Sequence, residues 1–299
     1  MRKKIDLKVF FTMILICSIW GGQQVAIKLL ESNITASMQI GLRSGVAALM
    51  VFLLLNKKDC ILRRLADPRL LPAAMMTGGL FALEFFMVTA AITRTQTSHI
   101  SLFLYTAPVI TAVGLHFLIP EEKLNKYQWA GVSCSVAGTA LALGIGSSNL
   151  DWSLSGDLFA IIAGLGWGVS TIIIRCTMLS TIPASCTLFY QLAIASIALC
   201  TYALICEPFN IVLDTTAVLN LSCQTIVVSF ISYLVWFSLL RQYQAASLSS
   251  LILMTPVLGI FAGNLILGEV MTSRFITGAS LLLLGLLFTV LCGKLQVKA

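Results

Sequence analysis

The chain has 299 residues, of which 58% are hydrophobic and only 10% are charged. Soluble domains carry roughly 25% charged residues, so this composition excludes an ordinary soluble protein and indicates one that lies in lipid. The net charge is +7, but the basic residues are spread over short loops instead of forming one stripe, which argues against nucleic-acid binding.

Segments of about 20 mostly apolar residues are long enough to cross roughly 30 Å of hydrocarbon as helices. The chain contains ten such segments, which predict an all-α integral membrane protein with ten transmembrane helices. The first segment is interpreted as a retained helix and not as a signal peptide, because its apolar run is long and lacks a small-x-small cleavage site. In chain order the predicted helices span 9–30, 36–55, 71–92, 97–119, 127–147, 156–178, 185–206, 219–240, 246–268 and 275–293.

The two halves of the chain share a pattern that indicates an ancient tandem duplication. A Trp-Gly pair, followed eight positions after the Trp by a basic residue, occurs in both halves at an offset of 147 residues. A Pro-Val pair and a Glu recur at an offset of 148. We therefore predict two repeats of five helices each, residues 1–147 and residues 148–299. The matched residues are Trp20 and Trp167, Gly21 and Gly168, Lys28 and Arg175, Pro108 and Pro256, and Glu121 and Glu269.

An odd number of crossings in each repeat makes the second repeat enter the membrane from the opposite side, so the repeats are predicted to be inverted. Lys and Arg concentrate in the cytoplasmic loops of membrane proteins. If both termini are cytoplasmic, 15 of the 19 basic residues fall on that side, which predicts this orientation in a bacterial inner membrane. The inward set is Arg2, Lys3, Lys4, Lys8, Lys57, Lys58, Arg63, Arg64, Arg69, Lys123, Lys126, Arg175, Arg241, Lys294 and Lys298.

Glu84 falls near the middle of the third predicted helix, where a carboxylate costs roughly 2.5–3.5 kcal/mol on insertion scales. Such a cost indicates a functional or a paired residue. Burial favours the neutral form of a carboxyl group, so Glu84 could take up and release a proton. We hypothesise that Glu84 lines a central cavity and either carries a coupling proton or contacts a cationic group of the substrate. A salt bridge to Arg43, inside the second helix, is the structural alternative.

Trp20 and Trp167 lie near the centres of the first and sixth helices, whereas membrane Trp residues normally gather at the two interfaces. An indole at mid-depth can stack on a planar or apolar substrate and donate a hydrogen bond. Gln24 shares a face with Trp20, because residues four apart on a helix are neighbours. Tyr233 and Trp236, on the eighth helix, are candidates for the opposite wall of a cavity. Simple helix packing is the alternative for these side chains.

Pro108 and Pro256 interrupt the fourth and ninth helices, and each leaves the carbonyl four residues earlier without its intrahelical partner. These carbonyls belong to Leu104 and Ile252. In a bilayer such groups persist only where protein or a water-filled cavity satisfies them. The pair therefore predicts two hinges, with a static kink as the alternative. Tyr105, close before Pro108, could supply a missing hydrogen bond or contact the cargo.

Glu121 and Glu269 end the fourth and ninth helices at matched positions, which predicts a repeated structural cap or loop contact and not a binding role. His99, a single histidine near the outer end of the fourth helix, is interpreted as a satisfied packing residue. Small residues spaced by four predict close helix contacts inside the bundle, with a dimer interface as the alternative. They are Gly41 and Gly45, Gly164 and Gly168, Gly259 and Gly263, and, in the fifth helix, Ala130, Cys134, Gly138 and Ala142.

Together these features resemble the drug/metabolite transporter superfamily, specifically the bacterial EamA-type transporters. The resemblance spans nearly the whole chain. It implies a ten-helix bundle of two inverted five-helix repeats that moves small metabolites by alternating access, often as an exporter. It implies no particular substrate, because the fold fixes the mode of action more than the cargo. It rests on the two Trp-Gly pairs, Arg43, Thr106-Ala107-Pro108-Val109, Met254-Thr255-Pro256-Val257, Glu121 and Glu269.

The sequence has no phosphate-binding loop and no Cys or His spacing suited to zinc, which predicts secondary transport without cofactor or metal. The expected partners are a small-molecule substrate, membrane lipid and, as candidate coupling ions, protons, but not nucleic acid. One alternative is an integral-membrane enzyme that acts on lipid, but the sequence lacks the motifs of hydrolytic enzymes. Another is a passive channel, which would need polar residues along a continuous pore. The predicted substrate-binding residues are Trp20, Gln24, Glu84, Tyr105, Trp167, Tyr233 and Trp236, with hinges at Pro108 and Pro256.

Overall fold

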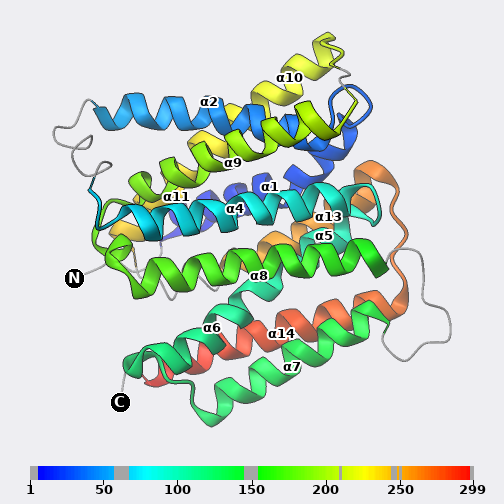
Figure 1. The fold of residues 1–299 in the computed structure, drawn as a ribbon. Helices are drawn as coiled ribbons and strands as arrows, with labels where there is room; N and C mark the ends of the chain where they lie inside the picture. Colours follow the sequence, from blue (N-terminus) through cyan, green and yellow to red (C-terminus); the bar gives the residue numbers. More distant parts are fainter. Residues whose placement is uncertain are drawn as a thin grey trace.

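The computed structural model describes residues 6–56, 67–144, 154–208, 211–243, 248 and 251–296, and this part of the chain is almost entirely helical (Figure 1). The 3₁₀ turn η1 (Leu104–Thr106) joins α5 to α6, and the π-helical stretch η4 (Gln224–Ser232) joins α10 to α11. The first half contributes α1 (Leu7–Leu29), α2 (Ala36–Asn56), α4 (Leu71–Ile92), α5 (Thr97–Phe103), α6 (Ala107–Leu118) and α7 (Lys126–Leu143). The second half contributes α8 (Leu154–Cys176), α9 (Ala184–Cys206), α10 (Thr215–Cys223), α11 (Tyr233–Gln242), α13 (Met254–Leu267) and α14 (Ser273–Gln296).

Eight helical segments of the described ranges are long and apolar enough to cross a membrane, so the chain is a multi-pass membrane protein. The segment predicted at 127–147 corresponds to α7, which has 18 residues and is not among the eight. The one predicted at 246–268 corresponds to α13, which has 14 residues. Residues 246–247 and 249–250 of that prediction lie outside the described residues. The count of ten crossings therefore stays a prediction.

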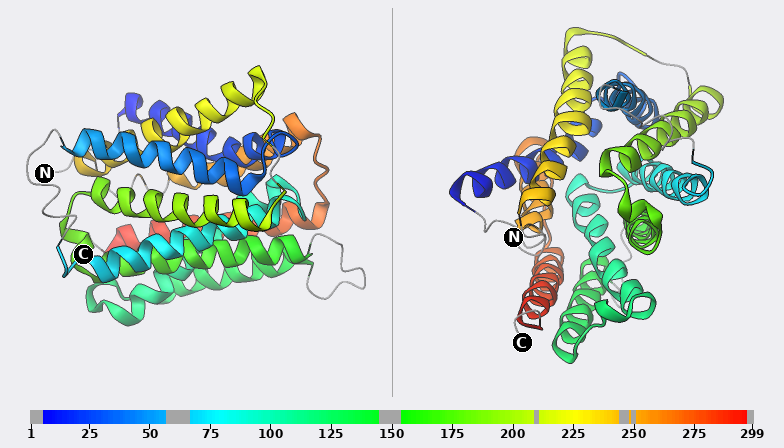
Figure 2. Two further views of the ribbon diagram at one scale, coloured as in Figure 1. Left: turned by 45° about the horizontal axis from the view of Figure 1, so that its top comes forward. Right: turned by 90° about the vertical axis from the view of Figure 1, so that its left-hand side faces the viewer.

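The helices lie side by side in one bundle (Figure 2), and α1 begins at the same end at which α14 finishes (Figure 1). Helix α1 packs against α13 and α5, while α4 packs against α8 and α9. Helices α7 and α14 pack mainly on each other at one edge of the bundle. A chain that starts and ends at one end of the bundle traverses it an even number of times.

Helices α7 and α14 run in opposite directions with their backbones in contact. A Cβ atom on Gly131 would lie 2.7 Å from the carbonyl oxygen of Gly285, and one on Gly138 would lie 2.7 Å from that of Gly278. Gly138 and Ala142 of the predicted ridge in the fifth helix therefore do face a neighbouring helix. Cys134 faces α14 as well, because its thiol donates to the Leu281 carbonyl at 3.4 Å. Ala130 is exposed, and Gly131 and Ser135, one residue further on, also contact α14.

Two further helix pairs, α2 with α9 and α5 with α13, cross in the same antiparallel way. In both pairs, the neighbouring helix lies so close to a glycine that a Cβ atom at that position would collide with it. The predicted glycine pairs Gly41/Gly45, Gly164/Gly168 and Gly259/Gly263 all pack inside the chain, as expected. The contacts are Gly41 with Cys200, Gly45 with Ser196, Gly164 with Thr106, Gly168 with Ala107, Gly259 with Ser101 and Gly263 with Thr97.

Substitution of Gly138 by Ala is expected to destabilise the protein by about 1–3 kcal/mol, because the new methyl group meets the α14 backbone, which cannot move aside as a side chain can. The matched control is Gly79→Ala in α4, where a Cβ atom meets nothing within 4 Å. Ala favours a helix over Gly, so this control is expected to be neutral or slightly stabilising. Thermal unfolding of both variants in detergent measures the difference, and equal unfolding midpoints would contradict the tight crossing.

Candidate functional site

Three of the predicted aromatic residues form one cluster between α1 and α11. The ring centroid of Trp20 lies 5.4 Å from that of Tyr233 and 5.7 Å from that of Trp236. The indole N–H of Trp20 donates to the Ser232 hydroxyl at 2.7 Å. Tyr233 and Trp236 therefore contact Trp20 directly instead of facing it from an opposite wall. Because η4 ends at Ser232, the π-helical stretch sets the direction in which these side chains leave the helix.

A second aromatic pair joins η1 to α8. Tyr105 meets Trp167 edge to face, with their ring centroids 5.6 Å apart. The Tyr105 hydroxyl also donates to the Ile252 carbonyl at 3.3 Å. This is the carbonyl that Pro256 cannot bond, so Tyr105 supplies the missing hydrogen bond, one of its two predicted roles.

The two prolines begin helices instead of kinking continuous ones. Pro108 is the second residue of α6, directly after η1, and Pro256 is the third residue of α13. The first turn of a helix tolerates proline, because its N–H would have no intrahelical partner there. The Leu104 carbonyl is satisfied by the backbone N–H of Ala107 within the 3₁₀ turn. Both positions are helix breaks, as the sequence predicts; whether they act as hinges stays a prediction.

Glu84 lies at the middle of α4 and is only 8% exposed. Its Oε2 atom is buried and has no hydrogen-bond partner in the described part of the chain. The salt bridge considered as an alternative does not form: among the described residues no ion pair joins Glu84 to Arg43. Helix α8 lies against α4 at this point, because a Cβ atom on Gly166 would lie 3.6 Å from the Glu84 backbone nitrogen.

Arg43 belongs to a buried polar network that the sequence analysis missed. Its guanidinium donates to Gln224 at 3.1 Å and lies 5.2 Å from the centre of the Phe85 ring. Gln224 in turn donates to the side chains of Gln39 and Asn220. The only signal in the sequence is a pair of amide residues, Asn220 and Gln224, four positions apart in an apolar segment. The network ties α2 to α10 and η4 and supports a structural role for Arg43.

Gln24 is 2% exposed on α1, and its Oε1 atom has no hydrogen-bond partner within the described ranges. It lies one turn beyond Trp20, as predicted from the spacing. Within the described ranges no hydrogen bond connects it to the aromatic residues, so its contribution to a binding site stays a prediction.

Glu269 joins two helix ends at what we call the distal end of the bundle, where α1 and α13 finish and α5 and α8 begin. Its carboxylate accepts hydrogen bonds from the backbone N–H and hydroxyl groups of both Thr97 and Ser98, at 2.6–2.9 Å. Gly263 leaves the room that this carboxylate fills. Burial raises the pKa of Glu269, but the hydrogen bonds from Ser98 and Thr97 outweigh burial and hold the pKa below its ordinary value. The predicted structural role of Glu269 is confirmed.

Its predicted counterpart Glu121 behaves differently. Glu121 is exposed in the short 3₁₀ turn η2 (Pro120–Glu122), and the neighbouring Glu122 pairs with Arg175 at 2.7 Å. The positions that correspond to Thr97 and Ser98 in the second half are 245 and 246, which lie outside the described residues. A cap by Glu121 therefore stays a prediction.

His99 is satisfied, as predicted. Its Nδ1 atom lies 3.0 Å from Asp157, and its ring stacks on Phe275 with centroids 4.1 Å apart. The Thr95 hydroxyl donates to the same carboxylate, and Lys28 donates to the Thr95 carbonyl at 3.1 Å. With the Glu269 contacts, these bonds hold α1, α5, α8 and α13 together at the distal end.

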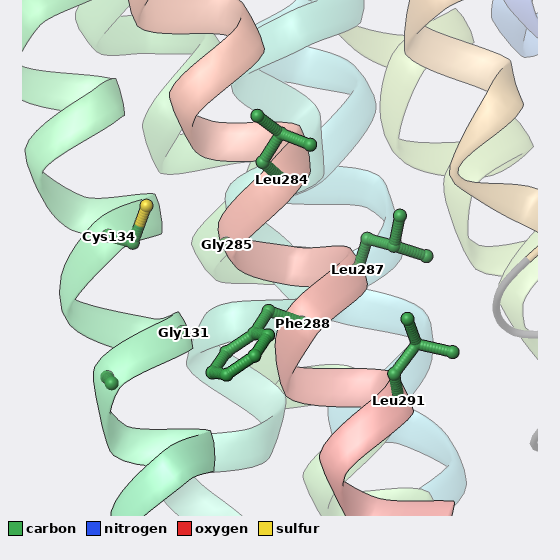
Figure 3. Close-up of a pocket in the computed structure, with 8 residues that line it drawn as sticks. Gly131, Cys134, Leu284, Gly285, Leu287, Phe288 and Leu291 are labelled. Carbon is green, nitrogen blue, oxygen red and sulfur yellow. The ribbon is translucent and has the colours of Figure 1, made fainter.

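A groove with a volume of about 440 Å³ lies between α7 and α14 (Figure 3). Its lining is apolar, and Phe288 lies between the two helices while Leu284, Leu287 and Leu291 project from α14. None of the predicted substrate-binding residues lines this groove. Polar groups that could orient a solute are found instead near Glu84 and Trp20.

Comparison with known proteins agrees with this architecture. The model of the EamA-like transporter family matches residues 7–144 and 154–291. The chain is similar to an uncharacterized transporter, YoaV, of Bacillus subtilis (28% identity over 93% of this chain and 95% of that one). It is also similar to a probable amino-acid metabolite efflux pump of Salmonella typhimurium (24% identity, 94% of each chain). A solved crystal structure with 18% identity shares the fold, with a TM-score of 0.67 over 97% of this chain and 98% of that one.

The fold is a multi-pass helical bundle that buries polar side chains within its helices. The family match covers nearly all of the chain in two blocks. The chain belongs to the EamA-like transporter family, in the drug/metabolite transporter superfamily, as its sequence motifs indicate.

Glu269→Gln is expected to destabilise the protein by about 1.5–3 kcal/mol at neutral pH, because hydrogen bonds to a charged group are lost. Since the folded pKa lies below the ordinary value of 4.5, this stabilisation is present above about pH 4.5 and is lost as the pH falls through the folded pKa. Unfolding midpoints measured from pH 7 to pH 3 should therefore converge for wild type and variant at low pH. Glu121→Gln, at an exposed position, is the control and should match wild type throughout.

Proposed function

We propose that this protein is a secondary transporter that moves a small metabolite or drug-like solute across the bacterial inner membrane by alternating access. The single observation that carries the proposal is the unpartnered carboxylate of Glu84, held at mid-helix within a bundle of the EamA-like family. Charged groups inside membrane segments are rare and mark substrate or ion pathways. We further propose export as the direction. Relatives from Salmonella typhimurium and Escherichia coli, each named a probable amino-acid metabolite efflux pump, support it.

The proposed architecture is two inverted repeats, residues 1–147 and residues 148–299, with ten crossings in total. Support comes from three pairs of helices that occupy corresponding places in the two halves: α2 with α9, α5 with α13, and α7 with α14. Each pair crosses in opposite directions at a glycine. Inverted repeats run in opposite directions through the membrane, so corresponding helices that meet at the interface between repeats must cross antiparallel.

The proposed binding site consists of Trp20, Gln24, Glu84, Tyr105, Trp167, Tyr233 and Trp236. Contacts join parts of this set, because Trp20 contacts Tyr233 and Trp236, and Tyr105 contacts Trp167. Helix α8, which carries Trp167, lies against α4 at Glu84. Pro108 and Pro256 are the proposed hinges. The Tyr105–Ile252 hydrogen bond bridges the two helix breaks that these prolines follow, so motion at one break is transmitted to the other.

The proposed orientation places both termini in the cytoplasm, so that the distal end faces outward. In the structure, the Glu269 and Asp157 contacts join the distal ends of α1, α5, α8 and α13. Alternating access closes one end of the central site while the other opens. The network at the distal end supports a state that is closed to the outside, and Glu121, exposed at the opposite end, is consistent with it.

Transport by purified protein in liposomes that hold a pH-sensitive dye tests the proposal. The panel comprises amino acids, nucleosides, methylated cofactors and organic cations, and the variant is Glu84→Gln, with Glu121→Gln as the matched control. Secondary transport coupled to protons predicts substrate-dependent proton movement in wild type and control, reduced at least about tenfold in Glu84→Gln because the charged group is lost.

Flux of a substrate without proton movement would leave a facilitator or exchanger and remove Glu84 from coupling. Equal proton movement in all three proteins would likewise contradict the role given to Glu84. Absence of flux for every compound, in protein shown to be folded by its unfolding transition, would contradict transport of these solute classes.

A further inference from the structure

Glu84 is a buried carboxylate whose hydrogen bonding is incomplete in the described part of the molecule. It lies at mid-helix in α4 and is more than nine-tenths buried, yet Oε2 accepts no hydrogen bond there. Buried polar groups are nearly always bonded, and a buried charge is stable only when it is paired. By contrast, Glu269, equally buried, accepts four hydrogen bonds. The fold can therefore supply hydrogen-bond donors to a buried carboxylate, but it supplies none to Oε2 of Glu84 in the described ranges.

The Arg43 guanidinium does not pair with the Glu84 carboxylate. The Arg43 guanidinium is directed to Gln224 and to the face of Phe85, and no ion pair with Glu84 forms among the described residues. The Gln224 side chain is fixed in turn by Gln39 and Asn220. Arg43 is thus oriented by Gln224, whose own side chain is fixed by two further hydrogen bonds, and turning the guanidinium to Glu84 would break the Arg43–Gln224 bond. The Arg43 Nε atom has no partner in the described ranges, so it does not donate to Glu84.

The residue that corresponds to Glu84 in the second half of the chain does have a side-chain partner. At an offset of 148, Glu84 corresponds to Ser232, and at an offset of 147, Trp167 corresponds to Trp20. Trp20 donates to Ser232 at 2.7 Å, but no such bond joins Trp167 to Glu84 in the described ranges. Helix α8 still lies against α4 at this point, since a Cβ atom on Gly166 would lie 3.6 Å from the Glu84 backbone nitrogen. Ser232 is thus hydrogen-bonded by a tryptophan of the other half, whereas Glu84 is not.

We propose that Glu84 binds the ammonium group of a cationic amine, and that Trp167 and Tyr105 contact the apolar part of the same molecule. This inference rests on the proposed function and names the substrate class of its site. A primary ammonium supplies both the charge and the hydrogen-bond donors that the open carboxylate lacks. Trp167 and Tyr105 favour a cation with an apolar body, because their rings offer apolar surface beside the carboxylate that holds the charge. A carboxylate ligand would place a second negative charge beside Glu84.

Three probes with the same phenylethyl body and different head groups test this assignment: 2-phenylethylamine, 2-phenylethanol and 3-phenylpropionate. Each is titrated against the full-length protein in detergent, and the dissociation constant is taken from the ligand-dependent shift of the unfolding midpoint. The amine is expected to bind about tenfold or more tightly than the alcohol, because a hydrogen-bonded charge pair replaces a neutral contact. The acid is expected to bind most weakly.

Glu84→Gln is expected to remove the preference for the amine, while Glu84→Asp, which keeps the charge, should retain part of it. Glu121→Gln serves as the matched surface control and should retain all of it. Equal binding of the amine and the alcohol by wild type, no binding of the amine, or an amine preference that survives in Glu84→Gln would overturn the assignment. The wild-type comparison needs no variant, so it stands even if Glu84→Gln does not fold.

Failure here is distinguishable from failure of the proposed function. If the liposomes transport members of the amino acid or nucleoside panel while the amine and the alcohol bind equally, secondary transport stands and the amine assignment falls. If the amine is preferred through Glu84 but neither the amine nor any member of the panel is moved in liposomes, the binding class stands and transport falls.

Discussion

Backbone contact between antiparallel helices is the constraint on which this bundle depends. Lipid tails are as apolar as leucine side chains, so helices in a membrane gain little from burying apolar surface against each other. Close packing has to supply the stability instead. Gly138 against α14 and Gly41 against α9 let the helix backbones approach to distances that a Cβ atom would prevent. The same crossings fix which residues of the two halves meet, and so the position of every polar group described above.

Buried polar side chains in the bundle differ in how fully they are bonded. At the distal end Glu269 accepts four hydrogen bonds, and Asp157 is bonded by both Thr95 and His99. Nearby Gln96, and Gln24 on α1, each keep a buried oxygen without a partner in the described chain. At the middle of α4, one carboxylate oxygen of Glu84 also lacks a partner there. A buried polar group in this condition gains free energy from any ligand that brings the missing donors.

The sequence predicts those features that depend on local composition and spacing. Helix positions follow from apolar length, and the glycine pairs follow from the spacing of four; Glu269 was identified as structural because its place recurs in each half. The partner of Arg43 could not be predicted in this way, because Gln224 is 181 residues distant along the chain and only folding brings the two together. The contacts of Tyr233 and Trp236 were missed for another reason: their direction depends on the π-helical stretch, and α-helical spacing does not apply there.

That stretch, η4, also bears on how the two halves came to differ. Trp20 and Trp167 are separated by 147 residues, whereas Pro108 and Pro256 are separated by 148, so the second half holds one residue more between these landmarks. A π-helical turn accommodates an extra residue without ending the helix, and α4, at the corresponding place, is α-helical throughout. On the proposed duplication, η4 lies where the two halves differ in length by one residue. An extra residue in a regular α-helix would turn all the following side chains by about 100°, whereas a wider π turn takes it up within one turn. The helix beyond η4 thus keeps Tyr233 and Trp236 on the face toward Trp20, although the halves differ in length.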